Sequence, residues 1–227
     1  DSDYASFLLS KRVRFTGDGV DVNTGDINPI LFPFQRDIVR WAVRKGRCAV
    51  FADTGLGKTF IQLEWARILN KDTLIIAPLS VAKQTTGEAT KLGIKATLCR
   101  SPDDIEPGIC VTNYEMAIKF DPSRFDAVVL DESSILKAID GKTRRVLTEN
   151  FIDTPYRLCC TATPAPNDIA EIANHSEFLG IMTRPDMLAS FFVHDENGWR
   201  LKGHAKDQFF RWLSSWAMSI QLPSDLG

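Results

Sequence analysis

The sequence lacks any apolar run long enough to cross a bilayer. A transmembrane helix needs about 20 consecutive apolar residues, and no run approaches that length. The first residues, Asp1-Ser2-Asp3, do not have the basic and then apolar layout of a signal peptide. These absences predict a soluble cytoplasmic protein without a membrane partner.

Patterns typical of zinc sites or disulfide frameworks are also absent, because no cysteines form a C-x-x-C pair. All five cysteines lie within or beside short apolar runs: Cys48, Cys99, Cys110, Cys159 and Cys160. Free cysteines mostly behave as small buried hydrophobes, so we expect reduced, buried thiols. Metal-ligand spacing is likewise absent among the three histidines, which are His175, His194 and His204.

A strong charge bias is missing as well. The 27 Lys and Arg residues nearly balance the 29 Asp and Glu residues, giving a formal net charge of -2. This excludes a histone-like protein that coats nucleic acid by net charge, but not a local basic groove, because steering depends on where the charges lie. The 227 residues suffice for one good-sized domain, or for one domain with an appendage.

Short β-rich runs alternate with helical patterns, which is typical of a parallel α/β sheet. The expected strands are Cys48–Ala52, Thr73–Ala77, Ala96–Cys99, Ile109–Thr112, Ala127–Leu130 and Arg157–Thr161. Their near-continuous apolar character predicts a sheet that is covered on both faces. After about residue 165 the strand pattern stops, and we expect a mostly helical remainder. There, the spacing of Trp212, Ser215 and Trp216 favours a packing surface over a binding site.

A phosphate-binding loop is predicted between the first expected strand and an amphipathic helix. The segment Ala52–Thr59 matches G-x-x-x-x-G-K-[ST], except that Ala52 stands in place of the first glycine. Such a loop and the helix that follows direct backbone N–H groups at an anion. The expected ATP-binding residues are Thr54, Gly55, Leu56, Gly57, Lys58 and Thr59. Lys58 would contact the β- and γ-phosphates, and the Thr59 hydroxyl would ligate Mg²⁺. A glycine-rich turn with an exposed lysine is the alternative, which the strand–loop–helix context disfavours.

Two adjacent carboxylates end the strand Ala127–Leu130. Asp131 is placed to hold Mg²⁺ through its water shell. Glu132 is placed to orient or deprotonate the attacking water. In isolation, a polar loop start would be the favoured explanation of this pair, but its position after the phosphate loop and two intervening strands favours the catalytic role.

From Phe32 to Asn167 the sequence resembles the superfamily-two helicases, most closely the Swi/Snf-like DNA translocases. Phe34-Gln35 is similar to the family's Q motif, so Gln35 would recognise adenine. The run Ile76–Val81 resembles an element that contacts the nucleic-acid backbone, here through Pro78 and Ser80. The run Val111–Glu115 resembles a second such element, with Thr112 and Tyr114 as the expected contacts.

The downstream elements of this resemblance follow in the family's order. Asp131-Glu132-Ser133-Ser134 lies where the D-E-x-H box belongs, with Ser134 in place of histidine, and Leu136-Lys137 resembles the next element. Thr161–Asn167 resembles the segment that couples hydrolysis to motion, with Thr161, Ala162 and Thr163 at its start. The D-E-S-S variant together with T-A-T-P is similar to helicases of phages and prophages.

The resemblance implies a RecA-like P-loop NTPase lobe that uses ATP and Mg²⁺ and acts on nucleic acid, with double-stranded DNA as the expected partner. Such motors have a second RecA-like lobe, which supplies an arginine finger, and no similar motif follows Asn167. We therefore expect a lead-in over residues 1–30, the first RecA-like lobe over 31–180, and a helical extension over 181–227 that leads toward a missing second lobe. The cell would be bacterial or phage-infected.

Two other classes of function stay open. One is a P-loop phosphotransferase or nucleotide-sensing ATPase that does not act on nucleic acid. The other is a non-catalytic interaction module. Several basic residues lie near the expected DNA-facing loops and would contact phosphates or form exposed surface: Lys83, Lys119, Lys137, Lys142, Arg144 and Arg145.

Overall fold

The computed structural model describes residues 19–138, 141–165, 168–196 and 198–226. Its main sheet has seven strands in the order β3-β4-β2-β5-β6-β1-β9, and all pairings are parallel. The strands are β1 (Arg47–Ala52), β2 (Thr73–Ala77), β3 (Ala96–Leu98), β4 (Ile109–Asn113), β5 (Ala127–Asp131), β6 (Tyr156–Thr161) and β9 (Ala217–Ile220). The six expected strands are therefore confirmed, each within one residue at either end.

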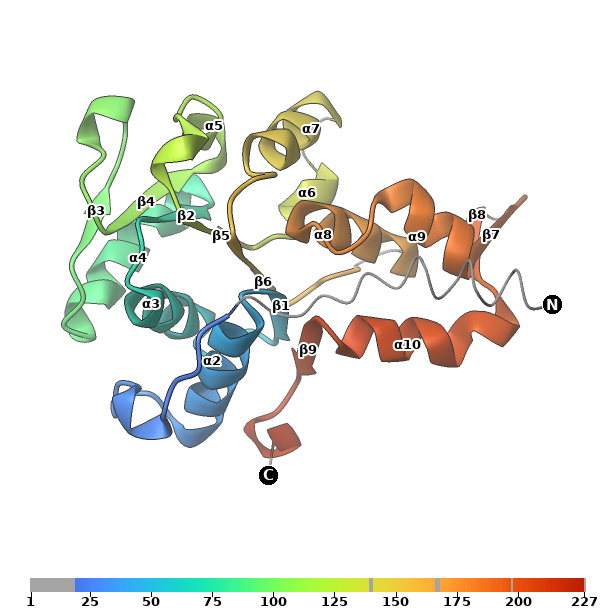
Figure 1. Ribbon diagram of the computed structural model, residues 1–227, viewed down its shortest axis with the longest axis horizontal. Coiled ribbons are helices and arrows are strands. Elements are labelled where there is room, and N and C mark those ends of the chain that lie inside the picture. Colours follow the sequence, from blue (N-terminus) through green and yellow to red (C-terminus); the bar gives the residue numbers. More distant parts are fainter. Residues whose placement is uncertain (1–18, 139–140, 166–167, 197, 227) are drawn as a thin grey trace.

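Helices cover both faces of this sheet, as the continuous apolar strands predict (Figure 1). One face packs against α2 (Pro33–Lys45), α3 (Lys58–Leu69) and α4 (Leu79–Lys91). The other face packs against α5 (Tyr114–Ala117), α6 (Ile135–Ala138), α7 (Gly141–Asn150), α8 (Ile172–Leu179), α9 (Arg184–Phe191) and α10 (Lys206–Ser214). Short 3-10 turns connect these elements: η1 (Thr24–Asp26), η2 (Pro102–Asp104), η3 (Pro122–Arg124), η4 (Ile169–Glu171), η5 (Gly203–Ala205) and η6 (Pro223–Leu226).

Strand β1 illustrates how the sequence fills two cores at once. Cys48 and Val50 point into the core beneath α2 and α3, whereas Ala49 and Phe51 point into the opposite core. Successive side chains of a strand point to opposite faces of the sheet. A strand whose side chains are all apolar therefore places apolar groups on both faces, and both faces must be covered. The five cysteines are free and buried, as expected.

The expectation that strands stop after residue 165 is wrong. Helices α8, α9 and α10 do dominate this part, but β7 (Phe192–Asp195) and β8 (Gly198–Leu201) form an antiparallel hairpin. Strand β9 then joins the main sheet, where Ala49 pairs with Ala217 and Ala52 with Ile220. This pairing covers the edge of β1, because an unpaired edge would leave its backbone N–H and C=O groups without partners.

The tryptophan stripe before β9 is a packing surface, as its spacing predicts. Trp216 is buried and Trp212 is half-buried, and their rings meet edge-to-face with centroids 5.2 Å apart. The ring of Trp212 also lies 5.3 Å from that of Phe191 on α9, while Ser215 is exposed. Among the described residues, no helix is both long and apolar enough to span a membrane.

Candidate functional site

The strand order brings the predicted motifs to one edge of the sheet. Strand β6 lies between β1 and β5, and Cys160 of β6 pairs with Val50 on one side and Asp131 on the other. Because parallel strands all end at the same edge, the phosphate loop after β1, the carboxylates after β5 and the segment after β6 lie next to one another. Positions far apart in the sequence thus form one site.

The phosphate loop has the curled backbone that its glycines permit. Gly55 and Gly57 have φ values of 85° and 76°, and helix α3 begins directly after Gly57. The loop folds over the side chain of Lys58, whose Nζ donates hydrogen bonds to the carbonyls of Ala52 at 3.0 Å and Asp53 at 3.3 Å. Positive φ is readily adopted by glycine alone, which explains both glycines. The ammonium group is therefore held at the centre of the loop.

Gln35 joins the start of α2 to the phosphate loop. Its Oε1 accepts a hydrogen bond from the N–H of Phe32 at 2.9 Å, and its Nε2 donates to the carbonyl of Leu56 at 3.0 Å. Only 4% of Gln35 is exposed. Both ends of the amide are thus used by backbone groups, so Gln35 supports the loop as well as lying beside the site.

The two carboxylates after β5 have different surroundings. Asp131 is buried, and its Oδ1 accepts hydrogen bonds from Gln62 Nε2 at 2.6 Å and from the N–H of Glu132 at 3.1 Å. Burial raises the pKa of Asp131 and the charge of Glu132 adds to this, while the bond from Gln62 opposes it. Glu132 is only half-buried, and its Oε2 accepts a hydrogen bond from Thr161 Oγ1 at 3.2 Å.

Gln62 was missed by the sequence reasoning, because nothing in its local pattern marks it. It lies one turn into α3, downstream of the loop, on the side that covers the sheet. The one feature that could have pointed to Gln62 is its place on the side of the helix that faces the core. A polar side chain buried there needs a hydrogen-bond partner.

The expected coupling segment begins within reach of Glu132. Thr161 Oγ1 donates to Glu132 and also accepts a hydrogen bond from the N–H of Thr163 at 3.1 Å. Ala162 is half-buried and Thr163 is exposed. The last two residues of this segment, Pro166 and Asn167, lie outside the described residues. Ser134 is half-buried beside Ser133, whose side chain contacts His175 of α8.

A cavity of about 600 Å³ opens over these groups. Its lining includes most of the expected nucleotide residues: Gln35, Thr54, Gly55, Gly57, Lys58, Thr59, Asp131 and Glu132. Leu56 is not among them and contributes its carbonyl to Gln35 instead. Ile30 and the exposed ring of Phe32 form an apolar part of the wall.

This donor set fits a nucleotide with Mg²⁺. Lys58 supplies a positive charge at the curled loop, and the hydroxyl of Thr59 shares the cavity with the carboxylate of Asp131. The described residues contain no group of three or more His, Cys, Asp and Glu side chains that could hold a metal by themselves. Mg²⁺ needs no such group, because it usually keeps waters and binds one or two carboxylates together with substrate phosphates.

The expected nucleic-acid contacts divide into two kinds. Pro78 is half-buried and Ser80 is exposed at the start of α4, so both are accessible. Thr112 and Tyr114 are buried, and their hydroxyls donate to the carbonyls of Cys99 at 2.8 Å and Asp131 at 2.7 Å. Burial also raises the pKa of Tyr114. The placement of these two side chains therefore does not support direct contact with a nucleic-acid backbone.

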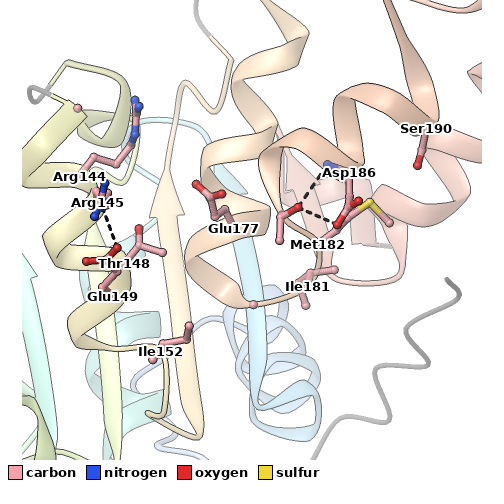
Figure 2. Close-up of a pocket in the computed structure, with 13 residues that line it drawn as sticks. Arg144, Arg145, Thr148, Glu149, Ile152, Glu177, Ile181, Met182, Asp186 and Ser190 are labelled. Carbon is pink, nitrogen blue, oxygen red and sulfur yellow. Dashed lines mark hydrogen bonds and ion pairs between the residues drawn. The ribbon is translucent and has the colours of Figure 1, made fainter.

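A larger cavity of about 780 Å³ lies apart from the phosphate loop, between α7 and the α8–α9 segment (Figure 2). Arg145 on its rim forms an ion pair with Glu149 one turn later at 2.8 Å, and Arg144 donates to the carbonyl of Leu136. Such an i,i+4 pair is typical of an exposed helix surface. The cavity shares no lining residue with the nucleotide site.

Taken together, a parallel sheet with a phosphate loop and paired carboxylates at one edge is the arrangement of a P-loop nucleotide-binding domain. The family model described as "Type III restriction enzyme, res subunit" matches residues 30–166. This match covers more than half of the chain, so the chain belongs to that family. No curated protein sequence matches it significantly.

Solved structures of an ATPase core and of a helicase share this fold. The SWI2/SNF2 ATPase core of Sulfolobus solfataricus, solved in complex with dsDNA, aligns with a TM-score of 0.73 and 19% identity, over 88% of this chain and 46% of that one. The UvsW helicase of bacteriophage T4 aligns with a TM-score of 0.56 and 16% identity, over 81% of this chain and 66% of that one. The chain thus spans less than half the length of the archaeal core.

Proposed function

We propose that this chain is the first ATP-binding lobe of a motor that couples ATP hydrolysis to movement on nucleic acid. The observation that carries this proposal is the hydrogen bond between Thr161 and Glu132. It connects the carboxylate placed to act on water with the segment that would transmit the result of hydrolysis. Family membership and the shared fold also support the proposal that this chain is such a lobe.

Each residue of the site has a role in this proposal. The loop Thr54–Thr59 would hold the phosphates, with Lys58 supplying charge. Thr59 and Asp131 would hold Mg²⁺, which neutralises phosphate charge when bound. Glu132 would orient or deprotonate the attacking water. Gln35 would contact adenine through the second N–H and the second oxygen lone pair that its two backbone bonds leave over. Ser134, Thr161, Ala162 and Thr163 would couple hydrolysis to motion.

Double-stranded DNA is the nucleic acid that we propose as the partner. Pro78 and Ser80 are accessible for phosphate contacts, and the archaeal SWI2/SNF2 core of the same fold is described in complex with dsDNA. Around Thr112 and Tyr114 the contacts would come from the backbone, because both hydroxyls are engaged elsewhere. We further propose that residues 31–180 form the lobe, 1–30 lead into it, and 181–227 lead to a second RecA-like lobe. The location would be the cytoplasm of a bacterial or phage-infected cell.

An ATPase that does not act on nucleic acid is the second candidate. The inward placement of Thr112 and Tyr114 favours it, because two of the four expected nucleic-acid contacts are unavailable as side chains. Stimulation of ATP turnover by duplex DNA distinguishes the two candidates, since only the motor requires the polymer for coupling.

The test compares ATP turnover of residues 1–227 with that of a version extended by the second lobe, each with and without duplex DNA. We expect almost no DNA-stimulated turnover by the short chain, because an arginine finger contributes about 10³–10⁵ in rate and would lie on the second lobe. The extended protein should be stimulated. Robust stimulation of the short chain would contradict the two-lobe proposal.

Two variants of the extended protein separate the carboxylates. Glu132→Gln should bind nucleotide normally and lose turnover by about 10²-fold or more, the scale of a lost general base. Asp131→Asn should instead weaken Mg²⁺-dependent binding. Normal hydrolysis by both variants would show that these roles are wrong.

A further inference from the structure

The backbone of Glu132 has an unusual conformation. Its φ is 49°, in the left-handed region, and the other described non-glycine residue there is Asn70 at the end of α3. Left-handed backbone is unfavourable for a residue such as glutamate, and it persists only where the surroundings hold it. The contacts on either side of Glu132 must therefore provide that support.

Strand β6 provides part of it. The N–H of Ser133 donates to the carbonyl of Cys160 at 2.9 Å, and the Glu132 carboxylate accepts from Thr161 at 3.2 Å. These bonds hold the backbone after Glu132 and the end of its side chain. The side chain of Ser133, which is fully buried, lies beside the Cys159 thiol of β6 and is also held by a second element.

That element is α8. His175 Nε2 and Ser133 Oγ form a hydrogen bond of 3.0 Å between two buried side chains that are 42 positions apart. The His175 ring also meets the ring of Phe51 edge-to-face, with centroids 5.4 Å apart and an interplanar angle of 77°. Phe51 precedes the phosphate loop, and Ser133 follows the two carboxylates. His175 therefore contacts one residue next to each of these two motifs.

The surroundings keep this imidazole neutral. Only 2% of His175 is exposed, and burial lowers its pKa to about 4, while the backbone of Glu171 acts in the opposite direction. A second link runs parallel to it, because Lys137 of α6 forms an ion pair of 2.6 Å with Glu171. The segment after β6 is therefore attached twice to the segment after β5.

We propose that His175 is a positioning residue, which acts through its hydrogen bond to Ser133 to hold Glu132 in its left-handed conformation. The Glu132 carboxylate then faces Thr161 and the nucleotide cavity. This inference rests on the proposed role of Glu132 in hydrolysis. His175 does not line the cavity, so it would affect the rate of hydrolysis without contributing to nucleotide affinity.

The test uses three substitutions. His175→Leu keeps an apolar group against Phe51 but cannot bond to Ser133, and Ser133→Ala removes the same bond from the other side. His175→Gln is the conservative variant, because its amide nitrogen can reach the position of Nε2. The crystal structure of each 227-residue variant gives the φ of Glu132, and the two-lobe protein of the proposed function gives ATP turnover and affinity.

We expect Glu132 to leave the left-handed region in His175→Leu and Ser133→Ala. Turnover should fall by about 10–100-fold, because displacing a reacting group by 1 Å can cost about 10² in rate, while the Kd for Mg·ATP stays within about twofold. His175→Gln should behave like the wild type, and the double variant should be no slower than either single one.

An unchanged φ at Glu132, or full turnover, in Ser133→Ala would overturn the proposal. The same result in His175→Leu would do so too, and if that variant does not fold, Ser133→Ala decides alone. Failure of the proposed function gives a different pattern, in which the wild type does not bind Mg·ATP or Glu132→Gln keeps full turnover.

Discussion

Gln62 Nε2 donates a hydrogen bond of 2.6 Å to Oδ1 of Asp131, between residues 69 positions apart. Both side chains are buried, at 0% and 4% exposure. Gln62 lies on α3, the helix that follows the phosphate loop, and its bond holds one carboxylate oxygen of Asp131 in place. The position of the proposed Mg²⁺ ligand is therefore coupled to the position of that loop.

Replacing Gln62 by leucine should weaken Mg²⁺-dependent ATP binding by about 10-fold, because groups that orient a metal ligand typically contribute 10–100-fold in affinity. ATP binding without Mg²⁺ should change little. Gln62 Oε1 has no hydrogen-bond partner among the described residues. Replacing the amide by leucine therefore removes mainly the bond from Nε2 to Asp131. Titration calorimetry with and without Mg²⁺ measures both affinities. The exposed Gln208→Leu on α10 serves as control, and equal Mg²⁺ dependence in the two variants would refute the coupling.

Two glycine-to-alanine changes should have opposite effects. At Gly57, whose φ is 76°, an added Cβ would lie 2.3 Å from Gln35 Nε2. We expect Gly57→Ala to lower the stability by about 1–2 kcal/mol, the cost of left-handed backbone, and to impair nucleotide binding. Gly87 lies within α4, and nothing lies within 4 Å of an added Cβ. Gly87→Ala should gain up to about 1 kcal/mol and bind nucleotide normally. Urea unfolding and ATP titration of both variants check this, and a tolerated alanine at Gly57 would contradict the loop geometry.

Acid should destabilise the protein through His175. Its folded pKa of about 4 lies below the ordinary 6.5, so between these values the unfolded chain binds a proton that the folded chain does not. Stability must then fall as the pH drops from 6.5 toward 4, by about 2 kcal/mol at pH 5. His175→Gln cannot titrate and should lack this contribution. Urea unfolding at pH 7.5 and 5 measures the difference, with the exposed His204→Gln as control. The same pH dependence in His175→Gln and the wild type would rule out this contribution.

The sequence predicts most of the fold because its strands carry strong local patterns. Strand β2, Thr73–Ala77, is entirely buried, and apolar runs such as Leu74-Ile75-Ile76-Ala77 can be recognised without tertiary information. Strand β9 is different, because Ala217–Ile220 has only four residues and begins three residues after the end of helix α10. Its strand conformation depends on pairing with β1, a contact between segments about 170 positions apart, and no local pattern contains that information.

The candidate site divides in the same way. Spacing within a motif predicts the roles of Lys58 and Asp131, because the chemistry of phosphate and Mg²⁺ restricts which residues can follow a strand. The direction of a side chain is not contained in a motif, and so Tyr114 was expected to contact nucleic acid although its side chain is buried in the core. Gln62 and His175 act through long-range hydrogen bonds, which only the packing of α3 and α8 on the sheet creates.

Binding of Mg·ATP at the phosphate loop is the central claim of this account, and a calorimetric titration of Lys58→Ala against the wild type tests it most directly. Lys58 is half-buried, and its Nζ donates hydrogen bonds to the carbonyls of Ala52 and Asp53 at the start of the loop, so the variant should keep its fold. A charged hydrogen bond contributes about 1.5–3 kcal/mol, so we predict that affinity falls by about 10–100-fold. The exposed Lys71→Ala should bind like the wild type. Unchanged affinity in a folded Lys58→Ala protein would contradict the assignment of this loop as the ATP site.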